Sequence, residues 1–218
     1  MNQRAKDLLI SGAGELGITL AGAQVAQLDA FAEELKRWNK KINLTAITDD
    51  EGIAIKHLVD SLSLLKVVRG PGRLLDIGSG GGFPCIPVKI VQPGLDIVSV
   101  DAVVKKISFQ KQAVRLLKLE GFDAIHVRAE TLAQDFAESF DWVVSRAFSD
   151  IPTFVKMALP VLNREGRIVA MKGKNAAEEI VAAEKALADL GVKVEKLENF
   201  TLPVSGDARS LIVLTRND

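Results

Sequence analysis

Residues 74–84 read LLDIGSGGGFP, and this stretch decides the fold class of the chain. A short apolar run leads directly into Gly78, Gly80, Gly81 and Gly82. Glycine has no Cβ, so the backbone can approach a ligand closely at the point where a buried strand ends. The loop by itself is compatible with the pyrophosphate of a dinucleotide or with a nucleoside that carries no phosphate. Other residues must therefore separate these two alternatives.

Two features beside the loop bear on this choice: Asp101 suits any adenosine cofactor, and the residues after the glycines favour a nucleoside without a pyrophosphate. Asp101 ends the next apolar run, where a carboxylate can accept hydrogen bonds from two ribose hydroxyls. The third glycine of the dinucleotide fingerprint is replaced by Phe83, which Pro84 and Pro87 follow in the first turn of a helix. A glycine-rich turn can also serve only to join a strand to a helix, but the register of Asp101 favours ligand binding.

The chain from Arg73 onward alternates short apolar runs with segments of helical period. The runs are RLLDIG, DIVSVD, AIHVR, DWVVSRA, GRIVAMKG, VKVEKLENF and SLIVLTR. This alternation predicts an α/β fold with a mostly parallel sheet that is covered on both faces. Only TLPVSGDAR separates the last two runs, which leaves no room for a helix and predicts an antiparallel pair at the sheet edge.

The residues before this alternation form two amphipathic helical patterns. Their apolar positions are Leu28, Phe31, Leu35, Trp38 and Ile42, then Ile55, Leu58, Leu62 and Leu65. The breaker RGPGR follows at residues 69–73. We predict a small N-terminal helical cap over residues 1–70 and a ligand-binding domain over residues 71–218.

Composition and charge restrict the class of protein. Hydrophobic residues make up 48% and charged residues 26% of the 218 residues, as in ordinary soluble domains. Lysine plus arginine equals aspartate plus glutamate at 28 each, so the chain has no overall positive charge that would attract a nucleic acid. Any such partner must be bound by a local basic patch. The single Cys85 excludes an internal disulfide, and with two histidines a metal site is not expected. The first residues resemble neither a signal peptide nor a membrane span, so we expect a cytoplasmic protein.

Polar residues follow the carboxyl ends of five apolar runs, where ligands bind in doubly wound sheets. They are Asp76 and Gly78, Asp101, Arg128 and Glu130, Arg146, and Lys172. Because the ends of parallel strands share one edge, we expect these residues to line a single site.

These motifs resemble a known family. LDIGSGGGFPCIP, SVD, VRAE and SRAF, preceded by WNKKINLTAI and KHLVDSL, are similar to the bacterial small-subunit ribosomal RNA guanine-N7 methyltransferases, also called the glucose-inhibited division protein B family. The resemblance implies a class I methyltransferase fold with a Rossmann-like sheet, S-adenosylmethionine as methyl donor, and N7 of one guanine in 16S ribosomal RNA as acceptor. The family more often has glycine where this chain has Cys85.

The resemblance also implies the positions of the site residues. Those around the cofactor are Gly78, Gly80, Phe83, Asp101, Ala129, Glu130 and Arg146. Ala129 and Glu130 would meet the adenine, and Asp101 the ribose. Arg146 would act at the boundary between cofactor and guanine, where a guanidinium can hold a base edge or a phosphate bidentately. A strand-end salt bridge is the alternative role for Arg146.

The acceptor chemistry is consistent with what the sequence lacks. Carbon methylation needs a cysteine nucleophile, and Cys85 lies in the cofactor loop, where a buried inert thiol is expected. Amine methylation commonly uses Asn or Asp before two prolines and an aromatic residue, but SRAFSD stands at that place. Guanine N7 carries a lone pair and no proton, so it needs alignment rather than a base.

Contacts to RNA are expected from basic residues beside Trp38. They are Lys36, Arg37, Lys40 and Lys41, with a solvated helix face as the equal alternative. A weaker candidate set is Lys111, Arg115 and Lys118. His57 and Asp60 are expected to pair with each other or to cap a helix. The predicted partner is 16S ribosomal RNA or the small ribosomal subunit; rival functions are methylation of a small molecule or protein, or NAD-dependent oxidoreduction.

Overall fold

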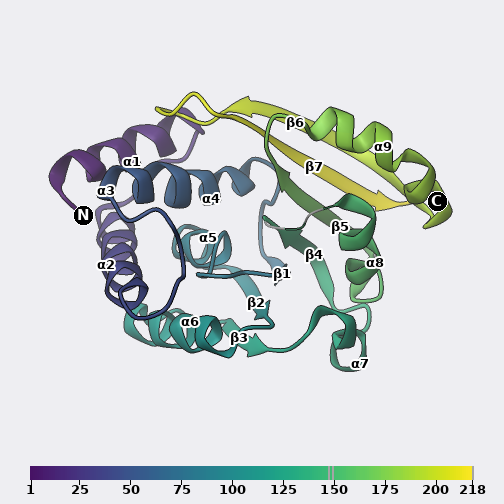
Figure 1. Cartoon of the computed structure of the whole chain (residues 1–218), viewed down its shortest axis with the longest axis horizontal. Helices are drawn as coiled ribbons and strands as arrows, with labels where there is room; N and C mark the ends of the chain where they lie inside the picture. Colours follow the sequence, from purple (N-terminus) through teal and green to yellow (C-terminus); the bar gives the residue numbers. More distant parts are fainter. Residues whose placement is uncertain (147, 149, 218) are drawn as a thin grey trace.

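The computed structural model describes residues 1–146, 148 and 150–217, which build a seven-stranded sheet between two layers of helices (Figure 1). The strand order is β3-β2-β1-β4-β5-β7-β6. The strands are β1 (Gly72–Ile77), β2 (Leu95–Asp101), β3 (Phe122–His126), β4 (Phe140–Ser145), β5 (Leu162–Lys172), β6 (Val192–Thr201) and β7 (Ala208–Arg216). The first five are parallel, and β7 runs antiparallel to both β5 and β6. The predicted mixed sheet and its antiparallel edge pair are confirmed.

The central strands are apolar in succession because both faces of the sheet are covered. In β1, Leu74 and Leu75 point to opposite faces, and both are fully buried. Helical segments pack on both faces of the sheet. On the first face lie α1 (Gln3–Glu15), α2 (Gly22–Asn39), η1 (Ile53–Val59), α5 (Cys85–Val91) and α6 (Val104–Leu117). On the second lie α8 (Ile151–Ala158) and α9 (Ala176–Asp189).

The N-terminal helices share one hydrophobic core with the first face of the sheet. Phe31 of α2 is fully buried and stacks on Phe109 of α6, with ring centroids 6.0 Å apart. Leu28 and Leu35 belong to the same cluster as Leu74. The division of the chain near residue 70 stays a prediction; the described residues on both sides of it pack into a common core.

Helix α2 ends at Asn39, three residues before the expected apolar position Ile42. The Asn39 side chain explains this end, because its Oδ1 accepts the N–H groups of Leu44 and Thr45 at 2.8 and 3.0 Å. Its Nδ2 donates to the Thr45 carbonyl at 2.9 Å. An amide that bonds the chain ahead of it competes with continuation of a helix. Ile42 still packs against the core from the loop.

The second predicted helical pattern is one helical segment of changing pitch. It contains α3 (Asp50–Gly52), η1, α4 (Asp60–Leu62) and η2 (Ser63–Lys66). The element η1 is a π-helix, a geometry that often occurs at functional sites. The short elements η3 (Ala129–Thr131) and α7 (Ala133–Phe136) follow β3. Within the described residues, every helix is too short or too polar to cross a membrane.

Candidate active site

The glycine loop is fixed to the sheet by its own backbone. The N–H groups of Gly78 and Ser79 donate to the Val100 carbonyl of β2 at 2.9 and 3.1 Å. Gly78, Gly80 and Gly82 have φ values of 77°, 57° and 78°, the left-handed region that favours glycine. The run of glycines therefore follows from the path that the backbone takes between β1 and α5.

The glycines have two different roles. A Cβ built on Gly78 or Gly80 would meet nothing within 4 Å, so open space lies in front of these two residues. A Cβ on Gly82 would instead collide with the buried side chain of Ile86. Gly78 and Gly80 thus leave a cradle of open space at the end of β1, whereas Gly82 allows the loop to pack on α5.

Asp101 joins the end of β2 to this cradle. Its Oδ2 accepts the Gly80 N–H at 2.9 Å, and its Oδ1 accepts the Val103 N–H at 2.8 Å. The residue is 7% exposed, and the Lys106 ammonium lies 3.8 Å from Oδ2. A carboxylate has about four acceptor positions, so Asp101 can hold the loop and still accept ligand hydroxyls.

A buried glutamine supports the loop from below, and the sequence analysis missed it. The Gln110 Nε2 donates to the Ser79 Oγ at 2.8 Å and to the Gly80 carbonyl at 2.9 Å. The Gln110 Oε1 accepts from the Ser99 hydroxyl at 2.6 Å. Gln110 is fully buried on α6. The available signal was a polar residue on the apolar side of a predicted helix.

Asp76 and Cys85 form a second buried pair behind the loop. Burial is the largest cause that raises the pKa of Asp76, to about 8, although Cys85 and Arg146 act against it. Both carboxylate oxygens of Asp76 are inaccessible to solvent. Burial and the neighbouring Asp76 raise the pKa of the Cys85 thiol well above its usual range. Cys85 is therefore a buried thiol and not a thiolate nucleophile, as expected.

The third motif follows β3 at the same sheet edge. The strand ends at His126, earlier than the run AIHVR suggested, so Arg128 precedes η3 instead of ending the strand. Ala129 is half-buried, while Arg128 and Glu130 are exposed. The His126 Nε2 lies 3.0 Å from the Ala102 carbonyl, which ties the ends of β2 and β3 together. The cofactor roles of Ala129 and Glu130 stay predictions.

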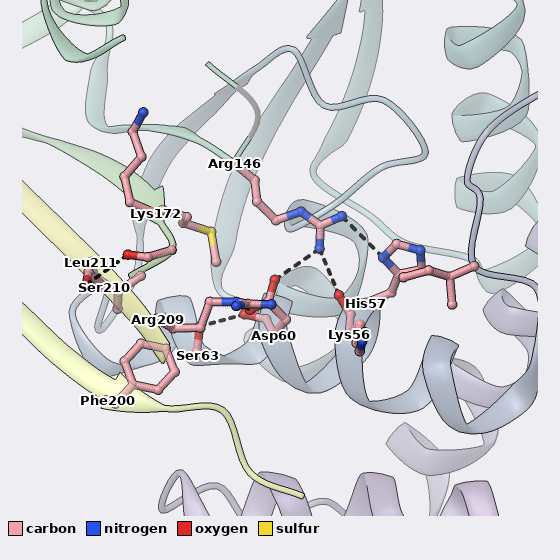
Figure 2. Close-up of a pocket in the computed structure, with 13 residues that line it drawn as sticks. Lys56, His57, Asp60, Ser63, Arg146, Lys172, Phe200, Arg209, Ser210 and Leu211 are labelled. Atoms are coloured by element: carbon pink, nitrogen blue, oxygen red, sulfur yellow. Dashed lines mark hydrogen bonds and ion pairs between the residues drawn. The ribbon is translucent and has the colours of Figure 1, made fainter. Parts of the chain in front are cut away.

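Arg146 lies at the end of β4 and contacts the π-helical segment (Figure 2). Its Nη1 lies 3.3 Å from the Asp60 Oδ2, and its Nη2 lies 3.3 Å from the His57 Nδ1. The Arg209 Nε donates to the other Asp60 oxygen at 2.8 Å. His57 and Asp60, expected to pair with each other or to cap a helix, therefore both bind Arg146. Burial lowers the pKa of the Arg146 guanidinium, against the effect of Asp60.

His57 is held in one neutral form. Burial and the nearby Arg146 lower its pKa to about 4. Because a guanidinium only donates, the His57 Nδ1 accepts from Arg146, and its Nε2–H donates to the Thr45 Oγ at 2.6 Å. The imidazole stacks on Phe83 with ring centroids 4.5 Å apart. The Arg146 guanidinium lies 5.1 Å from the same ring. Phe83 thus connects the glycine loop to this cluster.

A cavity of about 350 Å³ opens beside the cluster (Figure 2). The charged side chains and the histidine that border it are Lys56, His57, Asp60, Arg146, Lys172 and Arg209. Met171, Phe200 and Leu211 supply apolar walls. A ring of cations around one carboxylate, with apolar walls, suits a flat ligand that carries polar edges and a negative charge.

The basic residues beside Trp38 fall into two groups. The Lys36 Nζ lies 2.6 Å from both Glu33 and Asp50, and the Arg37 guanidinium lies 2.5 Å from Glu34. Lys40 and Lys41 are exposed, with no ion pair among the described residues. Metal-binding groups of three or more His, Cys, Asp or Glu side chains are likewise absent from the described part of the chain.

Comparison with known proteins decides the family. The sequence model of the rRNA small subunit methyltransferase G family, GidB, matches residues 24–211. The chain belongs to this family. It is 74% identical over 217 residues to Ribosomal RNA small subunit methyltransferase G of Geobacter sp. (strain M21), covering 100% of both chains. The corresponding protein of Geotalea uraniireducens (strain Rf4) is 57% identical over 216 residues, or 99% of both chains.

Solved structures agree with the fold of a GidB family member. A SAM dependent methyltransferase from Aquifex aeolicus superimposes with a TM-score of 0.59 at 14% identity, covering 84% of this chain and 97% of the other. The sheet is therefore a class I methyltransferase sheet, as the resemblance implied.

Proposed function

We propose that this protein transfers a methyl group from S-adenosylmethionine to N7 of a specific guanine in 16S ribosomal RNA. Its membership in the GidB family supports the reaction class. The structural observation that carries the proposal is the continuity of two sites through Phe83. This residue belongs to the glycine loop and contacts both His57 and Arg146, which border the cationic cavity.

The cofactor side fits a nucleoside ligand without a pyrophosphate. When bound, S-adenosylmethionine supplies a methyl group on a positively charged sulfur. Gly78 and Gly80 would support it with their open backbone, and the remaining acceptor positions of Asp101 would take the ribose hydroxyls. Ala129 and Glu130, at the adjoining end of β3, would border the adenine.

The acceptor side supplies alignment, and neither His57 nor Asp76 serves as a general base. His57 is neutral, and both of its ring nitrogens are engaged by Arg146 and Thr45. Asp76 holds its proton at neutral pH, because burial raises its pKa to about 8. Guanine N7 has a lone pair and no proton to lose, so residues that only position the base are sufficient. Arg146 is the group that we place at the boundary between donor and acceptor.

The RNA approaches the cavity over the N-terminal cap in this proposal. The cap, residues 1–70, contributes Lys56, His57 and Asp60 to a cavity that the domain of residues 71–218 completes. Lys40 and Lys41, which carry no ion pair among the described residues, would neutralise phosphates, with Lys36 and Arg37 beside them. The substrate is 16S ribosomal RNA, free or in a part-assembled small subunit, in the cytoplasm.

Methylation of ribosomal RNA from a strain that lacks the gene tests the function. The purified protein and labelled S-adenosylmethionine are expected to modify one guanine, which aniline cleaves after reduction of the 7-methylguanosine. Methylation of a small molecule or a protein, with no methylation of the RNA, would contradict the proposal. Thermal shifts give a second readout, because S-adenosylhomocysteine is expected to raise the melting temperature and NAD is not.

The acceptor atom is tested by the chemical step. With no proton to remove, the single-turnover rate is expected to be nearly flat from pH 5 to about 7.5, above the pKa of His57 and below that of Asp76. Cys85→Ser is expected to remain active, since no covalent adduct forms. A steep pH limb in this range, or a folded and inactive serine variant, would point to carbon methylation.

A further inference from the structure

We propose that Asp60 recognises the guanine base in the cavity, its carboxylate accepting hydrogen bonds from the N1–H and N2–H groups of the Watson–Crick edge. The inference rests on the proposed function, because it assigns the acceptor base to the cavity of about 350 Å³. It defines a guanine subsite made by α4, β4 and β7.

The position of Asp60 supports this role. Asp60 begins α4, directly after the π-helical turn, and borders the cavity with 8% of its side chain exposed (Figure 2). It is the only carboxylate among the described residues that line this cavity. The other charged side chains there are cations, and His57 is neutral. A buried carboxylate needs hydrogen-bond donors as partners, so in a substrate cavity it favours a ligand that donates hydrogen bonds.

The carboxylate retains capacity for a ligand. Its Oδ1 accepts from the Arg209 Nε at 2.8 Å, and its Oδ2 accepts from the Arg146 Nη1 at 3.3 Å. A carboxylate offers about four acceptor positions, so one position on each oxygen remains. Two parallel acceptors match the adjacent N1–H and N2–H donors of guanine. Both guanidinium groups keep further N–H donors for O6, the neighbouring acceptor on the same base.

The reaction itself favours recognition by a carboxylate. Arginine usually reads guanine by donating to O6 and N7 together. A donor on N7 would occupy the lone pair that must attack the methyl group. Asp60 engages Arg146 and Arg209 and reads the opposite edge of the ring, which leaves N7 free. Adenine has an acceptor at N1, and its lone pair would face the carboxylate. The subsite would therefore reject adenine.

Wild-type protein and three RNAs test the inference. After the methylated position is mapped, ligated 16S ribosomal RNA carries guanosine, inosine or 1-methylguanosine there, and is assembled into small subunits. Inosine lacks the N2 amino group and 1-methylguanosine lacks N1–H, while both retain N7. We expect kcat/KM for N7 methylation to fall about tenfold to hundredfold with inosine, and at least as much with 1-methylguanosine. Equal rates on guanosine and inosine would overturn the subsite.

Two variants separate recognition from structural support. Asp60→Asn is expected to lower the rate on guanosine and to reduce the preference for guanosine over inosine to about twofold. Arg209→Lys, which keeps the cation, is expected to slow methylation while the preference persists. An Asp60→Asn protein that folds and keeps the wild-type preference would overturn the inference. Absence of N7 methylation of the guanosine RNA by wild-type protein would instead overturn the proposed function.

Discussion

The proposed cofactor side and the proposed acceptor side of this site are built in different ways. The cofactor side consists of backbone, with the glycine loop hydrogen-bonded to β2 and held by Asp101. The acceptor side consists of side chains, in which Arg146 and Arg209 converge on Asp60. The first joins Gly80 to Asp101 over 21 positions of the chain, while the second joins residues 86 and 149 positions apart.

This difference has a physical consequence. A backbone cradle needs only the correct φ and ψ angles, so glycines at fixed spacing specify it locally. A buried network of charges needs every partner in place, because removal of one leaves another desolvated and unpaired. We therefore expect damage to the loop to affect folding and cofactor binding together, and damage to the cluster to affect methylation most.

The largest effect is expected from Gly82→Ala in the loop. The left-handed φ of 78° disfavours alanine, and the new Cβ collides with the buried Ile86. Strain and overpacking together should lower the free energy of unfolding by about 2–5 kcal/mol. Urea denaturation and S-adenosylhomocysteine titration measure the loss. The control is Gly14→Ala in α1, where nothing lies within 4 Å and alanine favours the helix. Equal stability of the two variants would contradict a local backbone constraint.

Next in size is Arg146→Ala on the acceptor side. Loss of a charged hydrogen-bonding group should lower kcat/KM by about 1.5–3 kcal/mol, roughly tenfold to 150-fold. The affinity for S-adenosylhomocysteine should stay within about twofold. The substitution should impair methylation far more than folding, which the melting temperature measures. Arg164→Ala, an exposed arginine of β5, serves as control. If Arg146→Ala methylates like wild type at an unchanged melting temperature, Arg146 lies outside the site.

The buried Asp76 makes the stability of the folded protein depend on pH. Its folded pKa of about 8 exceeds its ordinary 3.8, so the stabilising protonated form is lost as the pH rises toward 8. His57 has the opposite effect, because its pKa of about 4 lies below the ordinary 6.5 and it destabilises the fold only as the pH falls below 6.5. Of these two groups, Asp76 therefore dominates the change in the free energy of unfolding between pH 6.5 and 8.

Urea unfolding at pH 6.5 and pH 8 measures this effect in the free protein. Wild type should lose about 2 kcal/mol of unfolding free energy across the interval. Asp76→Asn should remove most of this loss, while Asp189→Asn on the surface of α9 should not. The same loss in wild type and Asp76→Asn would show that another group titrates.

The smallest effect concerns Lys40 and Lys41, which we propose that RNA contacts. Lys40→Ala with Lys41→Ala should reduce the slope of log affinity against log salt by about 1.5 and leave cofactor affinity unchanged. Lys36→Ala with Arg37→Ala is the matched control, because these cations already pair with carboxylates. The control should lower stability by about 1 kcal/mol or less. Equal salt slopes for wild type and the Lys40 and Lys41 variant would assign these lysines to solvent.

Local patterns predicted the fold well because each element carries its own signal. All seven apolar runs became strands, and the glycine loop joins β1 to α5 as expected. The errors lie at element ends, where side chains decide. Asn39 ends α2 before Ile42, and β3 ends at His126. Gln110 was missed because a polar residue within an amphipathic helix acquires a role only when the loop above it is known.

By itself, the sequence determined the sheet, the course of the glycine loop and the family, since these depend on short motifs and on apolar periodicity. The tertiary structure decided that His57 and Asp60 bind Arg146 and that Arg209 completes the cluster. No periodicity records such a meeting, because the partners lie 86 and 149 positions apart in the chain and meet only when η1, α4, β4 and β7 pack together. Burial then sets the charge states of Asp76 and His57, and burial is a property of the packed molecule and not of any motif.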